Sequence, residues 1–167
     1  METQYQDELK RLQDYAEWHG TQLTECFGFG QDGLVYATNQ ESALKCLRYE
    51  RLYQNERNVY QRLALLECDK IAGFNVPRLI NFDDSLWVVE IQIVSPPFVL
   101  DFAGASLDRQ PTVFAEMSEE DLDEWTEGRI ELYGDDWPRV ETLLAELRRR
   151  KIYLSDVKPG NITVQKS

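Results

Sequence analysis

The chain has 167 residues, the size of one ordinary domain, and its 43% hydrophobic and 29% charged residues are typical of a soluble globular protein. Eighteen basic against 30 acidic side chains give a net charge of −12, which disfavours binding to nucleic acid or to an anionic membrane surface. No apolar run approaches the roughly 20 residues that span a bilayer, and the N-terminus lacks the pattern of a signal peptide. We therefore expect a cytoplasmic protein with a single domain.

The cysteines and the histidine argue against two further classes of site. Cys26, Cys46 and Cys68 are odd in number and form no close pair, which disfavours a disulfide framework and a zinc site. His19 is the single histidine, and its place at the end of a predicted helix indicates a capping or solvated role rather than catalysis.

The first half of the chain is predicted to form a helix, several strands and a second helix. Helical spacing of apolar residues covers residues 3–18, where we expect a surface helix, and Gly20 provides a stop. Strand patterns follow from 21 to 49, with a glycine-rich bend and a turn at Asn39–Ser42. Helical spacing returns over 50–68, and RLINFDD followed by LWVVEIQIV then predicts a second hairpin on the same sheet.

The middle of the chain breaks this pattern. Ser95-Pro96-Pro97 reads as a connector, so we divide the chain into an N-terminal helix (1–20), a first lobe (21–94) and a second lobe (95–167). A good helix with Val140 and Leu147 on its apolar face lies in the second lobe.

Residues 116–136 are strongly acidic. They hold ten acids against Arg129 and supply −9 of the net charge. Ser118 and Asp121 have the spacing of a capping box, which predicts a short acidic helix. Two interpretations remain open for its acids, a solvated face and a docking surface for a basic partner.

Three short motifs could carry chemistry. The first, GFGQDGLV, contains Gly28, Gly30 and Gly33, which would let a backbone turn sharply and approach a phosphate, although a glycine-rich hairpin needs glycine in any case. A strand follows this motif rather than a helix, which argues against a dinucleotide-binding fingerprint.

The second motif, ALKCL, places Lys45 within an apolar strand, where burial is costly unless a carboxylate such as Glu56 meets it. Exposure at a sheet edge is the alternative for Lys45.

The third motif, DVKPGN, follows a predicted helix and precedes an apolar strand. It gathers a carboxylate (Asp156), an ammonium (Lys158) and an amide (Asn161) in one short turn. Those groups suit phosphoryl transfer, as a base, a phosphate-binding cation and an oxygen ligand for a metal. A turn built on proline and glycine would also use Asp and Asn for side-chain-to-backbone bonds.

Taken in order, these motifs resemble the eukaryotic-type protein kinase-like superfamily, including its divergent bacterial members. GFGQDGLV is similar to the G-x-G-x-x-G-x-V loop, SALK stands where V-A-I-K would be, and IYLSDVKPGN stands where H-R-D-L-K-P-E-N would be. The resemblance covers residues 24–164. It implies an α+β fold, with an antiparallel first-lobe sheet carrying one main helix and a reduced, mostly helical second lobe.

The resemblance also implies a site for ATP and Mg²⁺. Gly28, Gly30 and Gly33 would cover the phosphates, Ala43 would contact adenine, and Lys45 would hold the α- and β-phosphates, braced by Glu56. The backbone of residues 90–94 would receive the adenine.

In the second lobe, the resemblance implies that Asp156 is the catalytic aspartate. Lys158 would assist the transferred phosphate and Asn161 would ligate magnesium.

The departures from the family pattern favour weak or absent catalysis. Leu154 and Ser155 replace the His-Arg of H-R-D, and the Asp-Phe-Gly aspartate would come after Ser167, which implies a truncated domain. The similar fragment at Asp101 precedes the catalytic loop, so we interpret it as loop structure or chance.

We therefore expect a pseudokinase-type binding module, whose short second lobe a protein partner or a second copy would cover. One alternative is an active minimal kinase completed by a partner or by Asp101. Another is a small α+β interaction domain unrelated to kinases.

Overall fold

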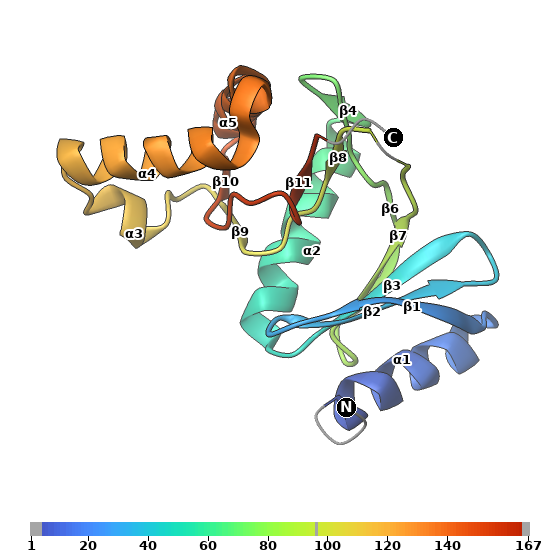
Figure 1. Ribbon diagram of the computed structural model, residues 1–167. Coiled ribbons are helices and arrows are strands. Elements are labelled where there is room, and N and C mark those ends of the chain that lie inside the picture. The colour runs from blue at the N-terminus through green and yellow to red at the C-terminus, as the bar shows by residue number, and fades with distance from the viewer. Residues whose placement is uncertain (1–4, 96, 165–167) are drawn as a thin grey trace. The chain divides into compact units, whose positions relative to one another are not determined.

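A computed structural model describes residues 5–95 and 97–164 and shows an α+β protein (Figure 1). The described residues fall into two compact units, the first within Met1–Leu65 and Pro77–Ile93, the second within Leu66–Val76 and Val94–Ser167. These units differ from the expected division into 1–20, 21–94 and 95–167, because the N-terminal helix belongs to the first unit, whereas residues 66–76 and Val94 belong to the second. Of the predicted connector, Pro96 lies outside the described residues.

The first unit is a five-stranded antiparallel sheet with one helix on each face (Figure 1). Its elements are α1 (Gln6–His19), β1 (Leu23–Phe29), β2 (Gly33–Thr38), β3 (Ser42–Leu47), α2 (Glu50–Leu65), β6 (Leu79–Asp83) and β7 (Val88–Gln92). The strand order is β1-β2-β3-β7-β6. The second hairpin predicted for this sheet is confirmed, because β6 pairs with β7 and β7 pairs with β3.

The expected surface helix is present as α1, and its buried side covers one face of the sheet. Leu12 and Tyr15 of α1 are completely buried and pack against Leu44 and Cys46 of β3. Burial raises the pKa of the Cys46 thiol to about 12, so this thiol stays protonated and unreactive at neutral pH. The amphipathic pattern located the apolar side of α1 correctly but did not reveal its partner.

Polar contacts also fix α1 to the sheet. Arg11 donates hydrogen bonds to the carbonyl oxygens of Leu47 and Leu86, each at 3.1 Å. Glu8 accepts from Arg48 at 2.6 Å. Burial is the largest single influence and acts to raise the pKa of Glu8. The hydrogen bond from Arg48, a backbone hydrogen bond and the charges of Arg48 and Arg11 together outweigh it, so the pKa lies below its ordinary value.

The second unit combines helices with two small sheets, and so is less purely helical than expected. Its elements are β4 (Lys70–Ile71), β5 (Phe74–Asn75), β8 (Val99–Leu100), β9 (Ala105–Leu107), α3 (Thr112–Ala115), α4 (Glu119–Tyr133), the single 3₁₀ turn η1 (Gly134–Asp136), α5 (Trp137–Arg149), β10 (Ile152–Leu154) and β11 (Ile162–Thr163). One sheet has the order β11-β8-β5-β4, and the other pairs β10 with β9.

Two features that the sequence predicts for helices of the second unit are confirmed, the apolar face of α5 and the capping box of α4. Val140 and Leu147 of α5 are buried in the core of this unit. At the start of α4, the Ser118 hydroxyl accepts from the Asp121 N–H while the Asp121 carboxylate accepts from the Ser118 N–H, so the predicted capping box is confirmed. Among helices built from residues 5–95 and 97–164, none has the length and apolar character that crossing a bilayer requires.

Candidate functional site

The glycine-rich motif forms the turn between β1 and β2. The Gly30 N–H donates to the Gly33 carbonyl at 3.0 Å. A Cβ on Gly33, whose φ is +153°, would lie only 2.0 Å from the Cys46 carbonyl oxygen, so β3 itself requires a glycine there. No such crowding exists at Gly28 or Gly30, where an added Cβ would meet nothing within 4 Å. The backbone at those two positions is therefore open to an approaching group.

Lys45 and Glu56 form a buried ion pair within the first unit. Lys45 Nζ lies 2.6 Å from Glu56 Oε1, and the two side chains are 8% and 3% exposed. Lys45 sits in the middle of β3, between Val35 of β2 and Val89 of β7, while α2 brings Glu56 over this face of the sheet. The expected ion pair is thus present, and the alternative of an exposed lysine at a sheet edge is wrong.

Most of the residues predicted to contact adenine belong to strands of the sheet. Ala43 is buried on β3, in register with Ala37 and Ile91. Residues 90–92 belong to β7, which pairs with β3 on one edge and with β6 on the other. Within the 90–94 segment, the backbone that remains beyond the strand is that of residues 93 and 94.

Glu90 serves the packing of α1. Its carboxylate accepts hydrogen bonds from the Tyr15 hydroxyl at 2.9 Å and from the Ser42 hydroxyl at 2.6 Å. Burial, reinforced by the Glu90 charge, raises the pKa of Tyr15 well above its ordinary value. This network satisfies a buried carboxylate without a metal or a ligand.

In the second unit, the DVKPGN turn brings its three functional side chains together. Asp156 Oδ2 lies 2.5 Å from Lys158 Nζ and accepts from Asn161 Nδ2 at 3.0 Å. Asn161, which is buried, also donates to the Asp156 carbonyl at 2.8 Å. The predicted residues therefore form one cluster. Asn161 also stabilises the turn through a side-chain-to-backbone bond, which is the alternative role that the sequence left open.

Residues outside the motif hold this turn in place. Arg129 of α4 donates to the Val157 carbonyl and lies over the Trp125 ring, 5.6 Å from its centroid. The Ser155 hydroxyl donates to the Gly104 carbonyl at 2.7 Å. Arg129 was not predicted to belong to the site, because the sequence around a single arginine among acids does not indicate which distant carbonyl it contacts.

Tyr133 of α4 lies close to the same turn. Burial raises its pKa to about 12; the nearby Arg129 charge lowers it and that of Asp156 raises it. The charged groups Arg129 and Asp156 thus act on this buried phenol in opposite directions.

Asp101 lies beside the DVKPGN turn. Its N–H donates to the Asn161 carbonyl at 2.7 Å, next to the pairing of β8 with β11. Its carboxylate Oδ1 accepts from the Ala103 N–H at 2.9 Å, which is the loop-stabilising role that we expected. The backbone contact also places Asp101 next to the candidate metal ligand, as the alternative of an Asp101-completed site requires.

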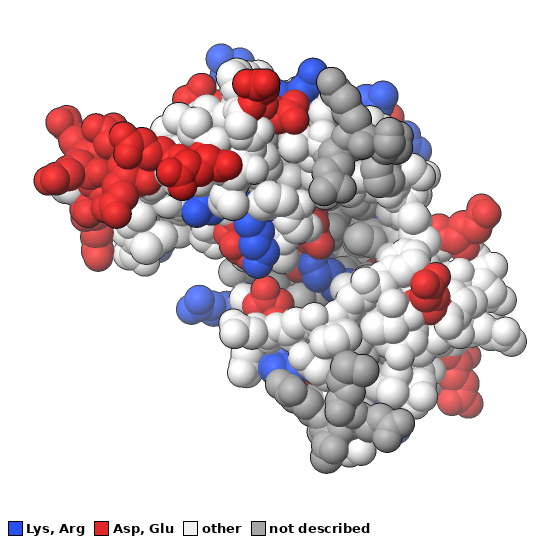
Figure 2. All heavy atoms as spheres, viewed as in Figure 1, with Lys and Arg blue, Asp and Glu red and all other residues white. Residues whose placement is uncertain are grey.

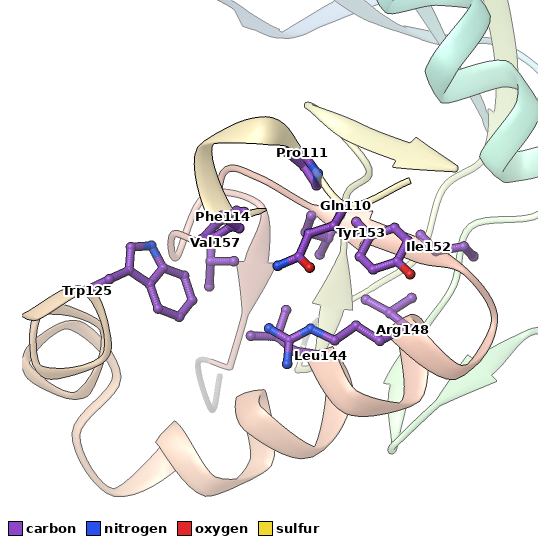
Figure 3. Close-up of a pocket in the computed structure, with 11 residues that line it drawn as sticks. Gln110, Pro111, Phe114, Trp125, Leu144, Arg148, Ile152, Tyr153 and Val157 are labelled. Atoms are coloured by element: carbon purple, nitrogen blue, oxygen red, sulfur yellow. The ribbon is translucent and has the colours of Figure 1, made fainter. Parts of the chain in front are cut away.

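A small cavity lies beside the turn, with Val157 in its wall. Its volume is about 20 Å³, and Figure 3 shows Phe114, Trp125, Leu144 and Val157 among the side chains around it. That volume holds about one water molecule, far less than a metabolite needs, and the walls mix apolar side chains with the polar groups of Gln110, Arg148 and Tyr153. We interpret it as a packing space under the turn rather than a ligand site.

The described part of the chain, 5–95 and 97–164, contains no group of three or more His, Cys, Asp or Glu side chains arranged to hold a metal ion. Asp156 and Asn161 carry carboxylate and amide oxygens, which are of the kind that Mg²⁺ binds. Comparison of the sequence with models of known protein families and with curated proteins finds no match.

Proposed function

We propose that this chain is a protein kinase-like domain that binds ATP and has weak or absent phosphotransferase activity, acting chiefly as a binding module. The observation that carries this proposal is the Lys45–Glu56 ion pair at 2.6 Å. Burying two charges costs more free energy than burying two apolar side chains of similar size. A lysine held in this way supplies a fixed cation for phosphates, which a purely structural pair would not need to provide.

Two further features support an ATP site. The backbone at Gly28 and Gly30 has open space beside it, as close approach of phosphates would require. Asp156, Lys158 and Asn161 gather in one turn, with Asp156 and Asn161 suited to Mg²⁺ and Lys158 to a phosphate. Because ATP is an intracellular metabolite, the same proposal makes the protein cytoplasmic.

The state of Asp156 is the reason for proposing weak transfer. A catalytic aspartate must accept a hydroxyl proton, but Oδ2 of Asp156 is already engaged by both Lys158 and Asn161. The Leu154-Ser155 pair in place of His-Arg points in the same direction. Catalysis would first require these contacts to rearrange.

The test combines nucleotide binding with phosphate transfer. We expect ATP with Mg²⁺ to raise the thermal unfolding midpoint of the wild type, and Lys45→Met to abolish that shift. Glu8→Gln is the matched control, since it breaks the partly buried ion pair of Glu8 with Arg48 in the first unit without touching Lys45. Transfer from γ-labelled ATP should not exceed that of Asp156→Asn.

Each result decides between the candidate functions. If ATP causes no shift in the wild type, the chain is better described as an interaction domain unrelated to kinases. If transfer clearly exceeds that of Asp156→Asn, the domain is an active kinase. Loss of that transfer in Asp101→Asn would then identify Asp101 as the completing carboxylate, which its contact with Asn161 favours.

A further inference from the structure

An open hollow lies between α3 and the first half of α4. We call its apolar lining side chains the floor and its acidic lining side chains the rim. Its volume is about 430 Å³, and it is lined by Val113, Glu116, Met117, Asp121, Glu124 and Trp125. We call it the acidic hollow. Val113 on its floor is 57% exposed, so an apolar side chain is available to a binding partner.

Among the residues that the structure describes, no cation pairs with the carboxylates around the acidic hollow. Residues 116–136 carry ten acids and one arginine, and Figure 2 shows these acids gathered over α4. Within residues 5–95 and 97–164, none of the ten acids takes part in an ion pair. Arg129, the single cation of this segment, is directed to the Val157 carbonyl instead.

The spacing of the acids along α4 destabilises the free helix. Glu120 and Glu124 are four residues apart, as are Asp123, Glu127 and Glu131, so carboxylates stand one above another along the helix. Only the first-turn acids are explained by the helix dipole and by the capping box of Asp121. Cations supplied from outside would relieve this repulsion.

We propose that the acidic hollow docks a Lys/Arg-rich amphipathic segment of a partner protein, which places an apolar side chain on Val113 and Met117. Its basic side chains pair with Glu116, Asp121 and Glu124 on the rim. Charge complementarity selects this partner, because a local charge of −9 repels nucleic acid and anionic lipid. The combination of apolar anchor and basic flanks is a recurrent mode of peptide recognition.

A second copy of the chain fits the acidic hollow less well. Its most basic stretch is Arg148–Lys151, but Arg149 and Arg150 already pair with Glu146 of the same helix at 2.5 and 2.8 Å. The net charge of −12 on each copy adds a general repulsion.

The probe is a synthetic amphipathic peptide of about 18 Leu and Lys residues, compared with a permuted peptide of the same composition that lacks an apolar face. Binding to the purified full chain is measured by fluorescence anisotropy. We expect the amphipathic peptide to bind, and to bind more weakly as salt rises from about 0.05 to 0.5 M.

Two variants change the hollow without entering the core. Val113→Asp places a charge on the floor, and Glu124→Lys reverses one on the rim; each should weaken binding about tenfold. Ile80→Asp, at a side chain that is 55% exposed, and Glu17→Lys, at an exposed site on α1, are the matched controls and should leave affinity unchanged.

Three results would overturn the proposal. Equal binding of the permuted peptide would show unspecific charge attraction, and no binding up to about 1 mM would show that the hollow is not a docking site. Self-association of the wild type that Glu124→Lys abolishes would identify a second copy as the occupant. Because the ATP test does not involve this hollow, either proposal can fail alone.

Discussion

The buried pair of Lys45 and Glu56 allows stability and function to be separated. Lys45→Met removes the cation and Glu56→Leu removes the carboxylate, each with a side chain of similar size. Because the two side chains are 8% and 3% exposed, each single change leaves a charge in a largely dry environment. We expect each to lower the free energy of unfolding by about 3–5 kcal/mol, the usual cost of breaking a buried ion pair.

The double variant Lys45→Met/Glu56→Leu should behave differently. It leaves neither charge behind, so its free energy of unfolding should lie within about 1 kcal/mol of the wild type or above it. The coupling between the two positions would then reach several kcal/mol, well beyond the roughly 0.5 kcal/mol scatter of independent sites. Urea unfolding, followed by far-ultraviolet circular dichroism, measures all four proteins of the cycle.

The same double variant then tests the ATP proposal in a folded protein. ATP at about 100 times its dissociation constant should stabilise the wild type by about 2.7 kcal/mol and leave the double variant unchanged. If the losses of unfolding free energy in the two single variants simply add in the double variant, the argument that the two charges interact directly in a buried environment is refuted. A double variant that ATP stabilises as much as the wild type would refute the role of Lys45 in holding phosphates.

Three other perturbations test separate parts of the structure. Because the pKa of Glu8 is lower in the folded protein, its contribution to stability is present at neutral pH and is lost as the pH falls through that pKa. Glu8→Gln should therefore lower the free energy of unfolding by about 2 kcal/mol at pH 7, and by progressively less below about pH 4, as measured by urea unfolding. A loss of stability that does not change with pH would contradict this argument. Gly33→Ala should lower the free energy of unfolding by about 3 kcal/mol or more, because the added Cβ clashes with the backbone of β3, whereas Gly30→Ala should lower it by less than about 1 kcal/mol. Equal losses would show that the backbone of β3 does not lie against Gly33. Arg129→Met should speed hydrogen exchange in the DVKPGN turn by leaving the Val157 carbonyl without its donor, and unchanged exchange would show that other contacts hold the turn.

Local sequence was enough to predict much of the first unit. The alternation in ALKCL separates Lys45 from Leu44 and Cys46, and the following helix is close enough in the chain to deliver Glu56. The hairpin of β6 and β7 was equally visible, because two apolar runs flank a turn-forming sequence. In each case the deciding contacts join neighbouring elements.

Contacts between distant segments could not be predicted in the same way. The two residues of β5 pair with β8 through Asn75 and Val99, which brings residues 66–76 into the second unit. Strands of two residues are too short to show a period. Likewise, the apolar stripe of α1 predicts a buried face but not that β3 lies beneath it.

The departures from the kinase pattern are where the structure adds most to the sequence. If the proposed resemblance to protein kinases holds, Leu154 and Ser155 stand where kinases have His and Arg, and the sequence offers no replacement for that scaffold. In the structure, Ser155 is bonded to the Gly104 carbonyl and Arg129 to the Val157 carbonyl, so both neighbours of Asp156 are fixed from other segments. Contacts of this kind restrain the position of the Asp156 carboxylate, but they do not determine whether it takes part in catalysis. The geometry of the turn can therefore persist with or without phosphoryl transfer, and only the comparison with Asp156→Asn separates the two.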